Sequence, residues 1–311
     1  METAAPTTAA AHPGGLDVLD PAAWRERERR HHERVDALLA DHLDRRRRGV
    51  AHPVEDFLFT YYSHRPAQLR RWHPGPGVLL TEAADDPPAG DWYRRAEAAD
   101  TAGRTVRGTT LDLTAFAAKR GATVDFVRAL LSAVQRRPAH LGCFGLHEWA
   151  MVYRLPPEEV RHSQVPLRLG AEGTDRVVES HRIRCSHFDA FRFFTDAARP
   201  RNRLQPTRES QADLDQPGCL HANMDLYKWA YKLSPGVPGE LVADCFELAR
   251  DIRELDMRAS PYDLRDHGYE PVEIETPEGK AAYVEAQRVF AERARGLRER
   301  LLEVCDRLAA G

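Results

Sequence analysis

The chain has 311 residues and a formal net charge of −3, with 42% hydrophobic and 30% charged residues. It contains no run of about 18 apolar residues, which excludes a membrane-spanning helix, and its N-terminal stretch lacks the charged and apolar regions of a secretory signal. Its five cysteines are scattered, without a Cys-x-x-Cys pair, so we expect a protein of the reducing cytoplasm without a disulfide framework.

The N-terminal third of the chain is predicted to contain one long helix. Residues 1–20 are expected to be a disordered tail, and residues 21–49 read as a long, highly charged helix. Residues 54–62 are an aromatic helix or strand, because periodicity alone does not decide between the two. Residues 63–110 are rich in Pro, Gly and Asp, which predicts a loop-dominated region.

Residues 111–311 are predicted to form a mainly helical core domain, with residues 21–110 as decoration upon it. An amphipathic helix is predicted over residues 123–137, with Thr123 as its N-cap. Residues 165–184 combine a Gly turn with alternating apolar residues, which predicts a small β-hairpin. The predicted fold class is therefore mainly α, with a minor β-hairpin element and a disordered N-terminal tail.

Further helices are predicted in the second half of the chain. A short one follows His187, and longer ones cover residues 220–233, 240–257 and 279–309. The first two long helices are expected to be antiparallel, because the Pro/Gly-rich link Pro235–Gly239 separates them.

Polar residues form one face of the helix predicted for residues 220–233. They recur at helical spacing: His221, Asp225, Lys228 and Lys232. One interpretation places this stripe in water, where an Asp225–Lys228 ion pair contributes little. The other places it in a cleft, between aromatic residues that can stack on a planar ligand. Both alternatives stay open at this point.

A stripe of carboxylates lies beside the apolar stripe of the helix predicted for residues 240–257. Its members are Asp244, Glu247, Asp251 and Glu254. Carboxylates on one helical face repel one another, so Lys228 and Lys232 of the preceding helix are expected to compensate them. A partly buried carboxylate with a raised pKa would then be available as a general base.

Three short motifs combine cysteine, histidine and carboxylate, which are all zinc ligands. They are Cys143-x3-His147-Glu148, Cys185-x-His187-x-Asp189 and Cys219-x-His221-x3-Asp225. Their spacing is unusual for a zinc site, and cysteines are also common as small buried residues in reduced proteins. A metal site and a set of buried thiols are both consistent with these motifs.

Two features suggest contact with nucleic acid. Residues 181–208 carry seven Arg and two Asp, whereas the whole chain is slightly acidic. The segment "SPGVPGE" at residues 234–240 resembles the hairpin of helix-hairpin-helix DNA glycosylases, in which backbone amides meet a phosphate. Here Pro238 stands where the second glycine of that turn is expected.

A longer resemblance covers most of residues 140–295. The run "RIRCSHFDAFRFFT…RPRN…PTRESQ…QPGCLHANMDLYKWAYKLSP…LVADCFELARDIRELDMRASPYDL…IETPEGKAAYV" resembles a group of bacterial proteins catalogued as 3-methyladenine DNA glycosylase-like. The resemblance implies hydrolysis of the N-glycosidic bond of an alkylated purine in duplex DNA, without a cofactor. No catalytic signature of a characterised alkyl-base glycosylase maps onto this chain.

Beside that resemblance, residues can be matched to the tasks of a glycosylase. Asp225 is the first candidate for the carboxylate, followed by Asp251 and Asp256, with His221 and Lys228 beside it. Lys228 as a Schiff-base nucleophile is the less favoured alternative. The candidates for stacking on a flipped base are Trp229, Tyr227, Tyr231, Trp149 and Phe188. The candidates for phosphate contacts are Arg199, Arg201, Arg203 and Arg208.

Two hypotheses compete with the glycosylase. One is a metal-dependent helical enzyme acting on a small molecule, with zinc or another transition metal held by His147, His187, His221 and Asp225. The other is a scaffold without enzymatic activity. No membrane partner is expected, and the sequence leaves the oligomeric state open.

Overall fold

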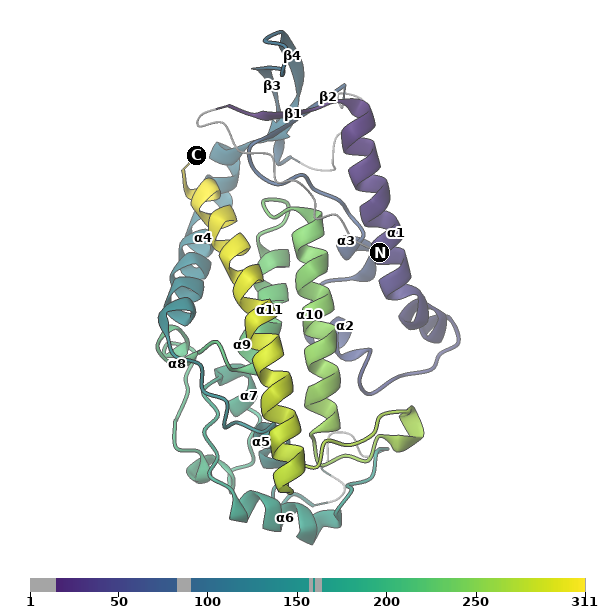
Figure 1. Cartoon of the computed structure of the whole chain (residues 1–311), viewed down its shortest axis with the longest axis vertical. Coiled ribbons are helices and arrows are strands. Elements are labelled where there is room, and N and C mark those ends of the chain that lie inside the picture. The colour runs from purple at the N-terminus through teal and green to yellow at the C-terminus, as the bar shows by residue number, and fades with distance from the viewer. Residues whose placement is uncertain (1–14, 83–90, 157–158, 160–163, 311) are drawn as a thin grey trace.

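The computed structural model describes residues 15–82, 91–156, 159 and 164–310, and its described part is mainly helical, as predicted (Figure 1). The α-helices are α1 (Pro21–Arg47), α2 (Phe57–Tyr61), α3 (Pro66–Leu69), α4 (Leu113–Arg136), α5 (Leu146–Ala150), α6 (Gly170–Ser180), α7 (Phe188–Phe191), α8 (Gln211–Leu214), α9 (Leu220–Lys232), α10 (Gly239–Arg258) and α11 (Pro277–Ala309). Short 3-10 turns lie at Arg199–Arg201 and Arg265–His267. None of these helices is long and apolar enough to cross a membrane.

Four long helices form the centre of the molecule. Helices α4, α9, α10 and α11 run along its long axis, and α1 packs against the outer side of α10 (Figure 1). The pairing of α9 with α10 confirms the predicted helical hairpin, and the break falls at Leu233–Pro238. The apolar residues of α9 and α10 recur every three to four positions, so each helix has one apolar face. The apolar faces of both helices are buried in the same core.

A small sheet caps one end of the bundle. Its strands are β1 (Asp17–Leu19), β2 (Val78–Thr81), β3 (Tyr93–Ala99) and β4 (Thr105–Leu111), in the order β1-β2-β4-β3. β1 pairs with β2 in parallel, and β4 is antiparallel to both of its neighbours. A β element is thus present, but it lies at the opposite end of the molecule from α6 (Figure 1).

Several predicted elements were placed wrongly. The hairpin predicted at residues 165–184 is wrong, because Gly170–Ser180 is helical. The region at 63–110 contains three of the four strands instead of being mostly loop. Helix α4 begins at Leu113, earlier than predicted, and its N-cap is Asp112, whose side chain accepts a hydrogen bond from the Ala115 amide.

The predicted disordered tail lies for the most part outside the described residues. Residues 1–14 are not described, but β1 falls within the predicted tail. Asp20 is the N-cap of α1, with its side chain accepting from the Ala23 amide at 2.8 Å. Order therefore starts before the boundary at residue 20. The aromatic segment at 54–62 resolves as a helix, α2.

The carboxylate stripe of α10 is compensated by arginines rather than by lysines of α9. Arg34 of α1 contacts Asp244 at 2.7 Å and Glu247 at 2.9 Å. Arg293 of α11 contacts Asp251 at 2.8 Å. The expected role of the α9 lysines is therefore wrong, because these carboxylates point toward α1 and α11 rather than toward α9.

Candidate functional site

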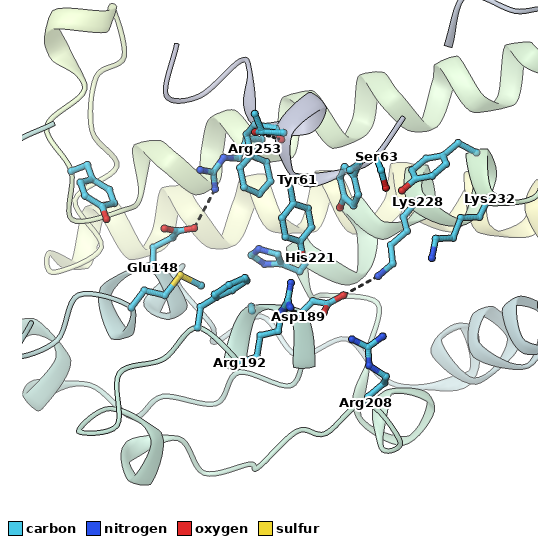
Figure 2. A pocket seen from close by; sticks show the side chains of 18 residues that line it. Tyr61, Ser63, Glu148, Asp189, Arg192, Arg208, His221, Lys228, Lys232 and Arg253 are labelled. Atoms are coloured by element: carbon cyan, nitrogen blue, oxygen red, sulfur yellow. Dashed lines mark hydrogen bonds and ion pairs between the residues drawn. The ribbon is translucent and has the colours of Figure 1, made fainter. Parts of the chain in front are cut away.

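A cavity of about 450 Å³ opens between α2, α7, α9 and α10. Its walls combine aromatic residues of the 57–63 segment with charged residues of the second half of the chain (Figure 2). His221 lies at its centre, with Tyr61 next to it, and charged side chains lie on either side. The polar stripe of α9 therefore faces a cleft rather than open water.

Three buried residues from three helices converge behind His221. His147 of α5 and Asp256 of α10 approach each other to 2.9 Å between Nε2 and Oδ1. The rings of His147 and His221 meet edge to face, with centroids 4.4 Å apart. Each of the three residues offers one ligand atom, and these atoms lie within 4.8 Å of one another. We call His147, His221 and Asp256 the first cluster.

The polar atoms of the first cluster are unusually poor in hydrogen bonds. His147 Nε2 and Asp256 Oδ1 are buried and face each other at 2.9 Å as an ion pair, and neither atom has a hydrogen bond of good geometry to a described residue. Buried polar atoms are normally satisfied, so convergent unsatisfied atoms need a physical explanation.

Protonation differs within the first cluster. Burial and then the neighbouring His147 lower the pKa of His221 well below its ordinary value, so its imidazole is neutral. Burial alone would also lower the pKa of His147, but the Asp256 carboxylate outweighs it and raises that pKa well above the ordinary value. The neutral His221 and the ionised Asp256 keep their lone pairs, whereas His147 would have to release its proton in order to bind a metal ion.

Arg253 orients the cluster from behind. Its Nη1 lies 3.2 Å from Asp256 Oδ2 and 3.2 Å from Glu148 Oε1. The guanidinium lies over the ring of Phe57, 3.8 Å from its centroid. Because this contact engages Oδ2, the other oxygen of Asp256 is left facing His147.

A second cluster contains His187, Asp189 and Asp225, whose ligand atoms also lie within 4.8 Å of one another. Its cationic partner is Lys228, whose Nζ lies 2.8 Å from Asp225 Oδ2 and 2.9 Å from Asp189 Oδ2. Asp215 accepts a hydrogen bond from His187 Nδ1 at 2.9 Å. This arrangement fixes the His187 ring and directs its Nε2 toward Asp225, 3.6 Å away.

Lys228 is a charged partner rather than a nucleophile. Burial would lower the pKa of Lys228, but Asp225 and Asp189 outweigh it and raise that pKa above the ordinary value. A protonated amine cannot attack a sugar carbon, so the Schiff-base alternative loses its basis. Asp225 is equally constrained, because its other oxygen accepts from the Tyr62 hydroxyl at 3.0 Å.

The structure brings together some predicted site residues. His221, Lys228, Tyr231 and Arg208 line the cavity, and Asp225 lies directly behind Lys228. The four residues of the alternative metal site also lie together, but they divide between the two clusters, with His187 and His221 stacked 5.6 Å apart.

Other predicted residues lie away from the cavity. Asp251 is paired with Arg293 of α11 and does not line the cavity. Trp149 is buried in the core and donates from Nε1 to the Ala259 carbonyl at 2.8 Å. Tyr227 is fully buried against its aromatic neighbours and does not line the cavity.

Two of the aromatic residues predicted to stack on a flipped nucleobase instead lie beneath cationic side chains. The ring of Trp229 lies beneath Lys228 and Lys232, 4.7 and 5.6 Å from the two ammonium groups. Phe188 lies beneath the Arg208 guanidinium at 5.5 Å. Both rings thus hold charged side chains at the edge of the cavity.

The predicted phosphate-binding arginines do not share one surface. Arg208 lines the cavity, whereas Arg203 lines a separate hollow of about 250 Å³. Arg201 lies over Tyr153 at 5.0 Å, and Arg199 lies over Phe191 at 5.4 Å. A single continuous phosphate track along all four is therefore not seen.

Sequence reasoning missed several residues of the site. Tyr61, Tyr62 and Arg253 were not predicted to belong to it, and neither was Asp215. A signal existed for Arg253, since a charged residue between the apolar Ile252 and Leu255 falls within the buried arc of the helix. The aromatic run at 54–62 stands out in the sequence, but nothing in the sequence links it to α9.

The fold and site define a helical protein with two buried histidine–carboxylate clusters beside a cationic cavity. The chain matches no protein-family model, curated protein or solved structure in the comparisons made. The comparisons therefore do not bear on the glycosylase resemblance.

Proposed function

We propose that this protein is a metal-dependent enzyme acting on a small molecule, with the metal held by His147, His221 and Asp256. The observation that carries the proposal is the convergence of ligand atoms from three different helices within 4.8 Å, two of which, His147 Nε2 and Asp256 Oδ1, are buried without a hydrogen bond of good geometry to any described residue. Two imidazoles and a carboxylate are a common ligand set for zinc and for non-haem iron(II).

The position of the first cluster suits catalysis better than a structural role. Structural zinc sites are closed by four protein ligands, whereas catalytic sites keep one position open. The first cluster supplies three ligands, and His221 also lines the cavity. Because His221 borders the cavity, a metal ion held by the first cluster would lie within reach of a molecule bound there, and it would polarise a substrate or lower the pKa of a bound water.

The surrounding residues resemble the support that metal ligands need. Ligating carboxylates are usually held by hydrogen bonds to their second oxygen, and here Arg253 contacts Asp256 Oδ2. The Cys143 thiol lies 3.9 Å from His147 Nδ1, on the side of the ring away from Asp256. Neither contact uses His147 Nε2 or Asp256 Oδ1, which face each other.

The test is metal content. The protein would be produced in medium supplemented with zinc, iron or manganese and measured by plasma mass spectrometry. We expect about one metal ion per chain in the wild type and less than about a tenth of that in His221→Ala and Asp256→Asn. His64→Ala is the matched control, because His64 is also a buried imidazole but lies against Tyr231, away from the first cluster.

Two results would overturn the metal site. One is a wild-type protein that retains no metal and gains no thermal stability from any of these ions. The other is unchanged metal content in both ligand variants. Loss of metal in His64→Ala as well would mean that the variants act through general unfolding, which circular dichroism checks.

Excision of an alkylated purine from duplex DNA is the second candidate function. It is favoured by the Asp225–Lys228 pair beside a cavity whose wall contains Tyr61 and Tyr231. Asp225→Asn keeps the shape of the side chain and removes its charge, so it should lower release of 3-methyladenine from alkylated DNA about 10²-fold, with little change in DNA affinity. No base release by the wild type at any salt concentration would exclude this function.

A further inference from the structure

We infer that one end of the cavity binds the anionic group of the substrate, and that this group is a phosphate monoester on a small planar body. The inference rests on the proposed function, since it names the substrate class of the same cavity. Its basis is an excess of positive charge that the described part of the chain leaves uncompensated.

Two cations at this end have no carboxylate partner. Neither Arg208 nor Lys232 has a carboxylate oxygen within 4.0 Å in the described part of the chain, although both line the cavity. Each is instead supported by an aromatic ring, Phe188 for Arg208 and Trp229 for Lys232. The rings hold the charged groups in place without neutralising them.

Two further cations share the available carboxylates. Lys228 lies between Asp225 and Asp189, and Arg192 Nε also lies 3.3 Å from Asp189. Four cationic side chains at this end thus face two carboxylates, an excess of two positive charges. A phosphate monoester carries a charge close to −2 at neutral pH, which matches that excess better than a single carboxylate does.

The arrangement of the residues suggests how such a molecule lies. Lys228, Lys232 and Arg208 gather on one side of His221, whereas Glu148 and Arg253 lie on the other side (Figure 2). Tyr61 lies next to His221, between these two ends. A substrate with its phosphate at the cationic end would place its planar body along Tyr61 and its reacting group at the first cluster.

The dimensions of the cavity favour a small molecule over duplex DNA. A volume of about 450 Å³ lies within the usual range for small-ligand sites. Binding to duplex DNA depends on many phosphate contacts along a surface. Of the four arginines predicted for that purpose, Arg208 lines the cavity, whereas Arg199 and Arg201 stack on rings elsewhere.

The test is calorimetric titration at pH 7.5 with phenyl phosphate, and with phenol as the uncharged probe. We expect phenyl phosphate to bind at least about tenfold more tightly than phenol, because each charge-assisted hydrogen bond is typically worth a factor of ten or more. Arg208→Gln and Lys232→Gln should each weaken phenyl phosphate about tenfold and leave phenol unchanged. Arg71→Gln and Lys280→Gln are matched controls outside the cavity and should have no effect.

Equal affinity for phenyl phosphate and phenol would overturn the inference, and so would equal losses in the control variants. It would also be overturned if a DNA duplex bound through Arg208 and Lys232 while phenyl phosphate did not. Titrations before and after treatment with a chelator separate the two proposals. Phosphate binding by a chain that never takes up metal supports this subsite and refutes the metal-dependent function, whereas metal uptake without a preference for phosphate does the reverse.

Discussion

Removing the charge of Lys228 should destabilise the protein strongly, because Lys228 compensates a buried carboxylate. Its side chain is 14% exposed, and that of Asp225 is 3% exposed. In Lys228→Met, Asp189 keeps its contact with Arg192, but Asp225 keeps only the hydroxyl of Tyr62 and a longer contact with His187 Nε2 at 3.6 Å. The substitution thus removes the close ammonium partner of a buried negative charge and leaves it only the more distant imidazole of His187.

The expected cost is about 3 kcal/mol of unfolding free energy, at the lower end of the range for breaking a buried ion pair. The lower end applies because the ammonium group is partly exposed to water in the cavity. Asp225→Asn should recover part of the loss, since it removes the uncompensated charge. The loss of unfolding free energy in the double variant is therefore expected to be smaller than the sum of the two single losses by about 1 kcal/mol or more.

Urea unfolding followed by circular dichroism measures these differences. Lys232→Met is the matched control, because Lys232 lies one turn further along α9 over the same Trp229 ring but has no carboxylate partner in the described chain. It should change the unfolding free energy by less than about 0.5 kcal/mol. The reasoning is refuted if the two lysine variants are equally stable, or if Asp225→Asn adds its full cost to that of Lys228→Met.

Three further predictions concern stability. Burial lowers the pKa of His64 to about 4, so the unfolded chain binds a proton more readily than the folded chain as the pH falls below about 6.5. The folded protein therefore loses stability between pH 7 and pH 4, and His64→Phe should remove up to about 3 kcal/mol of that loss. Urea unfolding at each pH measures the difference. Gly296→Ala should stabilise α11 by about 0.5–1 kcal/mol in thermal melts, because a methyl group there meets no atom within 4 Å; an unchanged melting temperature would contradict this. Gly108→Ala should destabilise the sheet by more than about 1 kcal/mol, since its Cβ would lie 2.3 Å from the Leu80 carbonyl oxygen; normal stability would show that the strands can separate at no cost.

The α9–α10 pair could be predicted from the sequence because its signals are local. Side chains three and four residues apart share a helical face, so the stripe through His221, Asp225 and Lys228 follows from spacing alone. Whether that stripe met water or a cavity could not be predicted, because the answer depends on Tyr61 and Tyr62. The bond from Tyr62 to Asp225 joins residues 163 positions apart.

The wrong hairpin at 165–184 shows the limit of local patterns. The Gly turn was real, since Gly170 has a φ of +64°, but it starts a helix rather than joining two strands. Thr174, Val177 and Val178 are β-branched, which favours strands, yet they are buried on one side of α6 at helical spacing. Tertiary packing here outweighs intrinsic propensity.

The prediction of partners for the α10 carboxylates was wrong for a related reason. The sequence offers many arginines, and spacing does not show which of them reaches a given acid. Proximity along the chain favoured Lys228 and Lys232, whereas the observed partner of Asp244 and Glu247 is Arg34, far away in α1. Long-range ion pairs of this kind need either a structure or co-varying positions.

The wall formed by residues 57–63 has a consequence for modularity. A fragment of residues 111–311 would contain all three residues of the first cluster, together with Asp225. It would lack Tyr61 beside His221 and the hydroxyl that Tyr62 donates to Asp225. A fusion protein that contains only the helical bundle would thus keep the ligand atoms but lose the wall that shields them from bulk solvent. A fusion that preserves this site has to begin upstream of α2.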